Sequence, residues 1–351
     1  MPESIVISID AMGGDHGPSV VVPAVAIALG RMPNLRLRFL LFGDEAKLNE
    51  ELAKAPAAKA VCEVRPTTLV IGMEDKPAQA LRRGKGSSLW NAVEAVKTGD
   101  AQAAVSAGNT GALMAISKLI LRMVAKELDR PAIVASWPTL RGFSAVLDVG
   151  ANVTSDAAQL VEFAIMGQAF HRAVHGEARP SVGLLNVGSE DQKGNEEVKE
   201  AHRLMREGDL PIDYHGFVEG DDIAKGTVDV VVTDGFSGNI ALKTAEGMAR
   251  FVRTLLREAF TSTPRAKLGA LVAGPTLKKM MARLDPASVN GGPLLGLNGI
   301  VVKSHGGADA RGFANALVVA ANLAQSDYST EINQNMLRLA EVMGREMEGR
   351  T

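Results

Sequence analysis

Short apolar runs alternate with helical patterns along most of the chain. The runs Ile5 to Ile9, Leu37 to Phe42 and Ala103 to Ser106 have the length and composition of buried strands. Between them, apolar residues recur at three- and four-residue spacing, as from Ser19 to Arg31 and from Thr110 to Val124, which indicates helices. This alternation predicts a three-layer αβα fold with a mostly parallel sheet and helices on both faces.

The rest of the chain continues this alternation. The remaining expected strands cover 61–64, 143–147, a short run from 181, 214–218, 228–233 and 298–302. The remaining expected helices are one capped by Asp44 that runs through Leu52, those over 87–97 and 155–174, and two more that begin near 309 and 329. The chain shows no internal repeat and no low-complexity linker. We therefore expect one α/β domain over residues 1–351, or two lobes that share a sheet.

Residues 244–284 interrupt this rhythm. The first part is an amphipathic helix with Phe251 to Phe260 on its apolar side, which we expect to pack on the core or in a dimer interface. Beyond Pro264, two short helical patterns flank Gly274-Pro275 and predict a basic amphipathic helical hairpin over 262–286. Eight basic residues and a single acid lie between Arg250 and Arg283. Such a segment is typical of contact with an anionic membrane or an acidic partner.

Composition narrows the class of protein. Hydrophobic residues make up 46% and charged residues 22%, as in ordinary globular proteins. Aromatic residues make up 4% and the net charge is −2, which disfavours a nucleic-acid binder. Cys62 is the only cysteine, so a reducing cytoplasm is expected. The N-terminal residues also lack the pattern of a signal peptide.

Six expected strand ends lead into glycine-rich loops with small polar residues. They cover 13–16, 106–111, 148–152, 186–189, 234–239 and 304–307. Glycine lets a backbone approach a ligand closely, and Asn, Ser and Thr supply neutral hydrogen bonds. One such loop alone favours simple turn chemistry. Six together favour an anion site, provided that they converge at one edge of the sheet.

Several common types of site are disfavoured. The chain contains no GxGxxG after a strand, no GxxxxGK[ST] and no GxSxG, which weakens nucleotide binding and serine nucleophile chemistry. Asp10, Asp15, His16 and His305 lie in or beside glycine-rich loops without metal-ligand spacing. We expect them to support these loops, and we expect neither a metal nor a cofactor. Lys193 stands where a strand leads into a helix, between Gly188 and Gly194, a position that favours anion binding over a solvated surface role.

Taken together, these motifs resemble the bacterial phosphate acyltransferases of phospholipid synthesis, the acyl-(acyl carrier protein):phosphate acyltransferase family. The resemblance spans nearly the whole chain and is carried by Asp10-Ala-Met-Gly-Gly-Asp15, Ser106-Ala-Gly-Asn-Thr-Gly-Ala-Leu-Met114, Asp148-Val-Gly-Ala-Asn152, Leu184-Leu-Asn-Val-Gly-Ser-Glu190 with Lys193-Gly-Asn195, Phe217-Val-Glu-Gly220, Asp234-Gly-Phe-Ser-Gly-Asn239, Pro293-Leu-Leu-Gly296 and Ser304-His-Gly306. It implies a dimer with a fold like that of isocitrate and isopropylmalate dehydrogenases and phosphotransacetylases.

The implied reaction moves a fatty acyl group from acyl carrier protein to inorganic phosphate, without a covalent acyl-enzyme. By this resemblance, Lys193 and Asn239 are the catalytic lysine and asparagine. The implied substrate- and phosphate-binding residues are Ser106, Asn109, Thr110, Asn152, Asn186, Gly188, Ser237 and Gly238. Alternatives on the same fold are a dehydrogenase, a short-chain phosphotransacetylase or a non-enzymatic anion-binding protein.

The resemblance also implies a cytoplasmic, peripherally membrane-associated homodimer. Its partners would be acyl carrier protein, phosphate, an anionic membrane surface and a downstream glycerol-3-phosphate acyltransferase that uses acyl phosphate; no nucleic acid is expected. The expected membrane or carrier contacts are Leu268, Leu271, Val272, Leu277, Lys278, Lys279, Met280, Met281 and Arg283.

Overall fold

The computed structural model describes residues 4–126, 128, 130–283 and 289–349. Its strands are β1 Ile5–Asp10, β2 Leu37–Gly43, β3 Cys62–Pro66, β4 Ala103–Ser106, β5 Ala132–Pro138, β6 Phe143–Leu147, β7 Ser181–Leu185, β8 Asp213–Val218, β9 Val230–Val232, β10 Gly292–Leu295 and β11 Ile300–Lys303. Its helices are α1 Pro18–Arg31, α2 Glu45–Lys54, α3 Pro56–Lys59, α4 Pro77–Arg83, α5 Ser88–Thr98, α6 Thr110–Leu121, α7 Ala157–His175, α8 Glu196–Glu207, α9 Gly220–Lys225, α10 Gly235–Thr261, α11 Pro264–Arg283, α12 Ala310–Gln325 and α13 Tyr328–Gly349. The expected α/β alternation is confirmed.

The strands form one sheet in the order β3-β2-β1-β4-β11-β10-β5-β6-β9-β7-β8. Strands β1, β2, β3, β4 and β11 are parallel to one another, and so are β6, β9, β7 and β8. At the centre, three successive pairings are antiparallel, namely β11 with β10, β10 with β5, and β5 with β6. The two parallel halves therefore run in opposite directions.

Two of the central strands were not predicted from the sequence. Strand β10 is only four residues long and contains Gly292 and Pro293, which are both uncommon inside strands. Strand β5 ends in Ser-Trp-Pro, without regular apolar alternation. Both strands are specified by their neighbours in the sheet rather than by local propensity.

Helices cover both faces of the sheet, and successive strand residues contribute to the two cores. Helices α1, α7 and α12 pack on one face, where Val230 and Val232 of β9 point. Helices α5 and α6 cover the other face of the first half, and Val231 belongs to the core on that side. The expected three layers are confirmed, because each face of the sheet buries its own apolar side chains.

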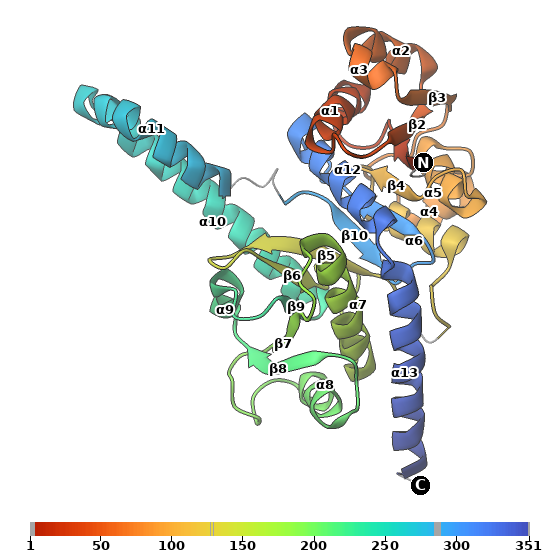
Figure 1. The fold of residues 1–351 in the computed structure, drawn as a ribbon, viewed down its shortest axis with the longest axis vertical. Coiled ribbons are helices and arrows are strands. Elements are labelled where there is room, and N and C mark those ends of the chain that lie inside the picture. The colour runs from red at the N-terminus through yellow and green to blue at the C-terminus, as the bar shows by residue number, and fades with distance from the viewer. Residues whose placement is uncertain (1–3, 127, 129, 284–288, 350–351) are drawn as a thin grey trace.

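Helices α10 and α11 form an antiparallel hairpin that projects from the body (Figure 1). The prediction placed both arms of a hairpin inside 262–286, with a break at Gly274-Pro275. The structure corrects this, because α11 runs through Pro275 from Pro264 to Arg283 and pairs with α10. Residues 284–286 lie outside the described part of the chain.

For Phe251 to Phe260, the expected packing on the core is corrected in part, and the expected dimer interface stays a prediction. Phe251 is 55% exposed and Leu255 is 47% exposed, so neither packs on the core. Leu256 and Phe260 are half-buried between the two arms. Among the described residues, no helix is both long and apolar enough to cross a bilayer.

Candidate active site

The six glycine-rich loops divide into two sets of three. Those after β1, β4 and β11 lie at one edge of the sheet, here called the first edge. Those after β6, β9 and β7 lie at the other, the second edge. The three antiparallel pairings at the centre reverse the second half, so the two sets of loops follow strands that run in opposite directions. The sets still approach each other, because the charge of Lys243 on α10 affects the pKa of Lys303 at the first edge.

At the first edge, Asp10 and Ser106 form a buried pair. The Ser106 hydroxyl donates to Asp10 Oδ2 at 2.7 Å and accepts from the Gly108 N–H at 2.9 Å. Both side chains are 2% exposed. Burial raises the pKa of the Asp10 carboxyl, and the hydrogen bond from Ser106 opposes that shift. In this structure, the Ser106 hydroxyl is committed to holding its own loop.

Asn109 and Thr110 begin the next helix. Asn109 Oδ1 accepts from the Ala112 N–H at 3.0 Å and caps α6. Its amide nitrogen lies 2.8 Å from each of the carbonyl oxygens of Met73 and Asp75. Asn109 thus ties the 72–75 loop to α6. Thr110 is the first residue of α6 and is half-buried.

Lys303, the last residue of β11, was not predicted as a site residue. Its Nζ donates to the carbonyl oxygens of Ala107 (3.2 Å) and Ser304. Burial lowers the pKa of Lys303 to about 8, Asp10 and Asp15 oppose this shift, and the charge of Lys243 on α10 adds to it. A lysine that closes an apolar strand just before a glycine-rich loop was the signal that could have identified it.

The residues expected to support the loops lie at this first edge. The Asp15 N–H donates to the Gly306 carbonyl at 3.0 Å, which joins the first and last of the three loops. His305 Nδ1 accepts from the Gly307 N–H at 3.1 Å. The side chains of Asp15, His16 and His305 are exposed. Among the described residues, no group of three His, Cys, Asp or Glu side chains could hold a metal ion.

At the second edge, a buried carboxylate organises the loop after β6. Asp148 Oδ1 accepts from the N–H groups of Ile133 (3.0 Å), Gly150 (3.2 Å) and Ala151 (3.0 Å). Asp148 Oδ2 accepts from the backbone N–H and the side-chain amide of Asn152, at 2.6 and 3.0 Å. Burial raises the pKa of Asp148, and these hydrogen bonds oppose the shift. The anion that this loop binds here is the protein's own carboxylate.

Asn152 and Asn186 are also engaged with the protein. The Asn152 amide donates to the Pro131 carbonyl at 2.9 Å as well as to Asp148, and it is 2% exposed. The Asn186 amide donates to the carbonyl of Lys193 at 3.1 Å, and its Oδ1 accepts from the Val187 N–H at 2.9 Å. Asn186 therefore sets the backbone position of Lys193.

Lys193 itself is exposed, and Gly188 lies beneath its side chain. A Cβ atom on Gly188 would lie 2.7 Å from a Glu190 carboxylate oxygen and 3.0 Å from Lys193 Cγ. The Lys193 N–H donates to the Glu190 carbonyl at 2.9 Å. The loop is thus a tight turn that displays its lysine to solvent.

Ser237, Gly238 and Asn239 lie within the first five residues of α10 rather than in a loop. Asp234 caps this helix by accepting from the Ser237 N–H (2.9 Å) and hydroxyl (2.8 Å). Gly238 is buried, and a Cβ atom there would lie 1.9 Å from the Asp148 carbonyl oxygen. This close approach requires glycine and locks the start of α10 onto the loop after β6.

Asn239 is exposed beside Gly150. A Cβ atom on Gly150, whose φ is 126°, would lie 3.5 Å from Asn239 Cγ. Strand β9, which leads to Asn239, is flanked by β6 and by β7, which leads to Lys193. Neighbouring strands are about 4.8 Å apart. The second edge therefore presents a cation, an amide and a helix N-terminus, a combination suited to an anion or to a developing oxyanion.

The expected membrane or carrier contacts lie elsewhere, on α11. Leu268, Leu271 and Val272 are 64%, 77% and 79% exposed, and Lys278 and Met280 are exposed as well. Leu277 and Met281 are half-buried and line a cavity between α10 and α11. The side chains of Lys279 and Arg283 lie outside the described part of the structure.

Comparison with known proteins identifies the family. A family model described as "Fatty acid synthesis protein" matches residues 5–331. A phosphate acyltransferase from Caulobacter vibrioides is 70% identical over 97% of this chain and 93% of its own length. Another from Maricaulis maris is 58% identical over 95% of each chain. The chain belongs to the phosphate acyltransferase family.

Solved structures show the fold of this acyltransferase. A phosphotransacetylase from Streptococcus pyogenes aligns with a TM-score of 0.62 at 17% identity, over 93% of this chain and 95% of its own. The EutD phosphotransacetylase from Staphylococcus aureus aligns with a TM-score of 0.58 at 16% identity, over 92% and 94%. These likenesses confirm the predicted phosphotransacetylase-like architecture.

Proposed function

We propose that this phosphate acyltransferase moves a fatty acyl group from acyl carrier protein to inorganic phosphate, and that the acyl phosphate is used in phospholipid synthesis. The family supports transfer of an acyl group to phosphate. The observation that carries the proposed site is the placement of Lys193 and Asn239 after neighbouring parallel strands of one edge. Both side chains are exposed to an incoming substrate.

The proposed reaction needs no nucleophile from the protein. A phosphate oxygen attacks the thioester carbonyl carbon, and the carbonyl oxygen becomes an oxyanion in the tetrahedral intermediate. The carbon–sulfur bond then breaks, the acyl–oxygen bond remains, and the carrier thiolate leaves and takes up a proton. Phosphate is already anionic at neutral pH, so the protein has to position it and stabilise charge.

Within this scheme, Lys193 and Asn239 have separate roles. Lys193 balances the charge of the phosphate during attack, and the Asn239 amide donates to the oxyanion. Asn239 lies at the positive end of the α10 dipole, which adds to this stabilisation. Ser237 and Gly238 fix that helix turn, and Gly188 and Asn186 fix the turn that bears Lys193.

Asn152, Ser106, Asn109 and Thr110 have supporting positions in this proposal. The Asn152 amide donates to the Asp148 carboxylate, which organises the loop after β6 at the second edge. Ser106, Asn109 and Thr110 order the first edge, where the strands run the opposite way. Because Ser106 and Asn109 are hydrogen-bonded within the protein, whereas Lys193 and Asn239 are exposed, we assign the direct contacts with the reacting atoms to Lys193 and Asn239.

The hairpin supports a peripheral role at an anionic membrane. Leu268, Leu271 and Val272 form an exposed apolar patch on α11. The basic residues around it would interact with anionic lipid headgroups. In this proposal, the enzyme acts at the cytoplasmic membrane surface as a homodimer. It receives acyl carrier protein there and passes acyl phosphate to a glycerol-3-phosphate acyltransferase.

The test is release of carrier thiol from a long-chain acyl carrier protein, with and without phosphate. The proposal expects thiol release that depends on phosphate and equals the acyl phosphate formed. Release that is independent of phosphate would contradict it. Equal rates with acetyl coenzyme A would instead favour a short-chain phosphotransacetylase.

A further inference from the structure

A cavity of about 360 Å³ lies between the two arms of the hairpin. This volume is within the range of small-molecule sites. The residues that line it are Arg253, Leu256, Arg257, Phe260, Thr261, Lys267, Ala270, Leu277 and Met281. The apolar members are half-buried and the basic ones are exposed, so the cavity has an apolar floor and a basic rim.

One position on the cavity side of α11 lacks a side chain. Ala270, Gly274 and Leu277 are spaced i, i+4 and i+7 and therefore lie on one face of the helix. A Cβ atom on Gly274 would have no heavy atom within 4 Å. A larger residue at this position would project into the interhelical space, where Leu256 and Phe260 form the opposite wall.

The groove is distinct from the outer apolar patch. Leu268 and Val272 lie two residues before Ala270 and two residues after it, so they point away from the groove. On α10, Phe251 and Leu255 are exposed, whereas Leu256 and Phe260 face α11. Both arms thus have two apolar faces, and the outer faces can contact a membrane while the groove holds another molecule.

The shape and charge of the groove select its ligand. From Lys267 to Met281, α11 rises by about 21 Å, which suits one extended fatty acyl chain. Packed helices lie roughly 8–10 Å apart, so there is room for one chain rather than for the paired chains of a phospholipid. None of the lining residues is acidic. Arg257 and Lys267 form a basic end, and Arg253 lies about one helical turn nearer the body.

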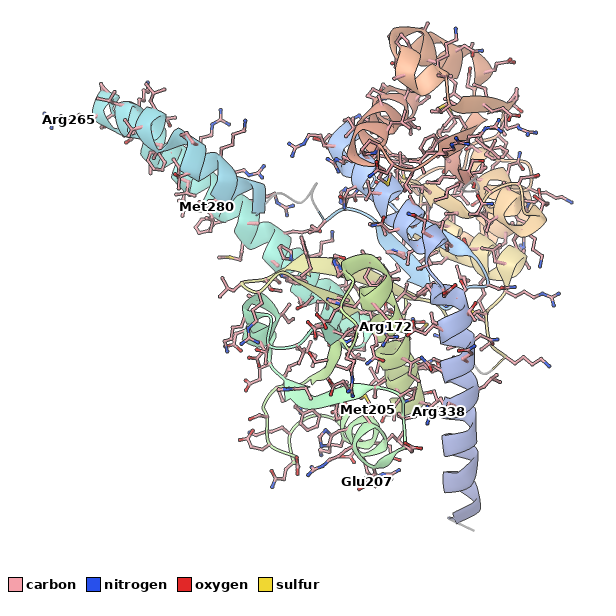
Figure 2. All side chains as sticks on the ribbon, viewed as in Figure 1. Arg172, Met205, Glu207, Arg265, Met280 and Arg338 are labelled. Atoms are coloured by element: carbon pink, nitrogen blue, oxygen red, sulfur yellow. The ribbon has the colours of Figure 1, made fainter. Side chains whose placement is uncertain are left out.

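We propose that this groove binds a single-chain fatty acyl anion, namely the long-chain acyl phosphate that the enzyme forms. The phosphate group lies between Arg257 and Lys267, and the acyl chain runs along Ala270 and Leu277. Figure 2 shows that Arg265 lies at the outer end of the hairpin and Met280 lies nearer the body, so the basic end of the groove is the outer one. The groove would keep the product's chain out of water until release. This inference rests on the proposed long-chain product.

The chain offers a matched pair of variants for the test. Gly274→Leu fills the groove, and Gly269→Leu places the same side chain one residue before Ala270, rotated by about 100°. A Cβ atom on Gly269 also has no heavy atom within 4 Å. Both changes replace glycine with a better helix former, but Gly274 precedes Pro275, where an added Cβ atom disfavours the helical backbone. The comparison therefore requires equal helix content in both variants. Circular dichroism of the full chain checks this.

The probe is dodecyl phosphate below its micellar concentration, titrated calorimetrically into the full-length protein. We expect one site per chain, at least about ten-fold weaker binding in Gly274→Leu, and a change below about two-fold in Gly269→Leu. The double variant Arg257→Gln with Lys267→Gln should also weaken dodecyl phosphate about ten-fold, while dodecanol binding stays the same. This second variant tests the head group separately from the chain.

Several outcomes would overturn the groove proposal. One is dodecyl phosphate binding that is unchanged in Gly274→Leu. Another is a wild type that binds dodecanol and dodecyl phosphate with equal affinity. Loss of dimer or of phosphatidylglycerol vesicle binding in Gly274→Leu, without any effect on dodecyl phosphate, would assign the groove to a second copy or to the membrane. If dodecyl phosphate binds as expected but phosphate-dependent thiol release fails, the proposed function is wrong and the groove stands.

Discussion

The sheet body and the α10–α11 hairpin use apolar side chains in opposite ways. In the body, Leu147, Val232 and Leu184 are fully buried at the ends of neighbouring strands, where they support the second edge. On the hairpin, Leu271 and Phe251 are 77% and 55% exposed. Exposed apolar surface of this extent does not stabilise an isolated chain and is typical of a binding surface. The comparison separates a rigid part that holds the reacting groups from a projecting part that meets other molecules.

Asp148→Asn should give the largest loss of stability and show how strongly the body depends on buried hydrogen bonds. Five N–H groups donate to the two oxygens of the Asp148 carboxylate. In asparagine, an NH₂ group would replace one of these oxygens and would face N–H donors instead of accepting from them. We expect the free energy of unfolding to fall by about 3 kcal/mol. Urea denaturation measures this. Asp191→Asn is the control, with a change below about 0.5 kcal/mol, because the Asp191 side chain is 72% exposed. Equal losses would contradict the special role of Asp148.

Two glycines of helix α10 test the difference between the rigid body and the projecting hairpin. In the body, a Cβ atom on Gly238 would lie 1.9 Å from the Asp148 carbonyl oxygen, whereas one on Gly247 has no heavy atom within 4 Å. Gly238→Ala should therefore destabilise the protein by about 2–3 kcal/mol. Gly247→Ala should stabilise it by roughly 0.5–1 kcal/mol, because alanine favours a helix. Thermal unfolding of both variants measures these changes in stability. Changes of the same sign in the two variants would contradict this expectation.

Lys303 gives a smaller, pH-dependent effect within the body. Its pKa is lowered to about 8 from 10.5, so between these values the unfolded chain binds more protons than the folded one. Stability should therefore rise with pH across this window, and the contribution should be lost as the pH falls through about 8. We expect about 2 kcal/mol from this one group. Lys303→Met should remove this part of the slope in denaturation curves, and an unchanged slope would exclude Lys303 as its source.

Much of the body could be predicted because local patterns and tertiary packing agree there. The apolar run at Ala103 to Ser106 and the cap at Asn109 each specify their own element. The reversal of the sheet could not be predicted, because it depends on β5 and β10, which the local pattern did not indicate. Each of the three antiparallel pairings at the centre involves at least one of these two strands.

The hairpin was predicted in kind but not in its boundaries. Gly274-Pro275 indicated a helix break, since proline removes a backbone donor and glycine weakens a helix. The structure retains one helix there, with Leu256 and Phe260 of α10 packed beside it. Contacts between the arms outweigh the local signal, and no periodicity within 262–286 could show that the partner arm lay before Thr261.

The most direct test of the proposed site compares Asn239→Ala in the body with Leu271→Glu on the hairpin. The measurement is the rate of phosphate-dependent thiol release from soluble long-chain acyl carrier protein, with folding checked by circular dichroism. Loss of the Asn239 amide should lower turnover by roughly 10²- to 10³-fold, as expected for one oxyanion donor. Leu271→Glu should stay within about two-fold of wild type while binding to phosphatidylglycerol vesicles is lost. An Asn239→Ala rate within a few-fold of wild type would contradict the central claim that the second edge carries the reaction.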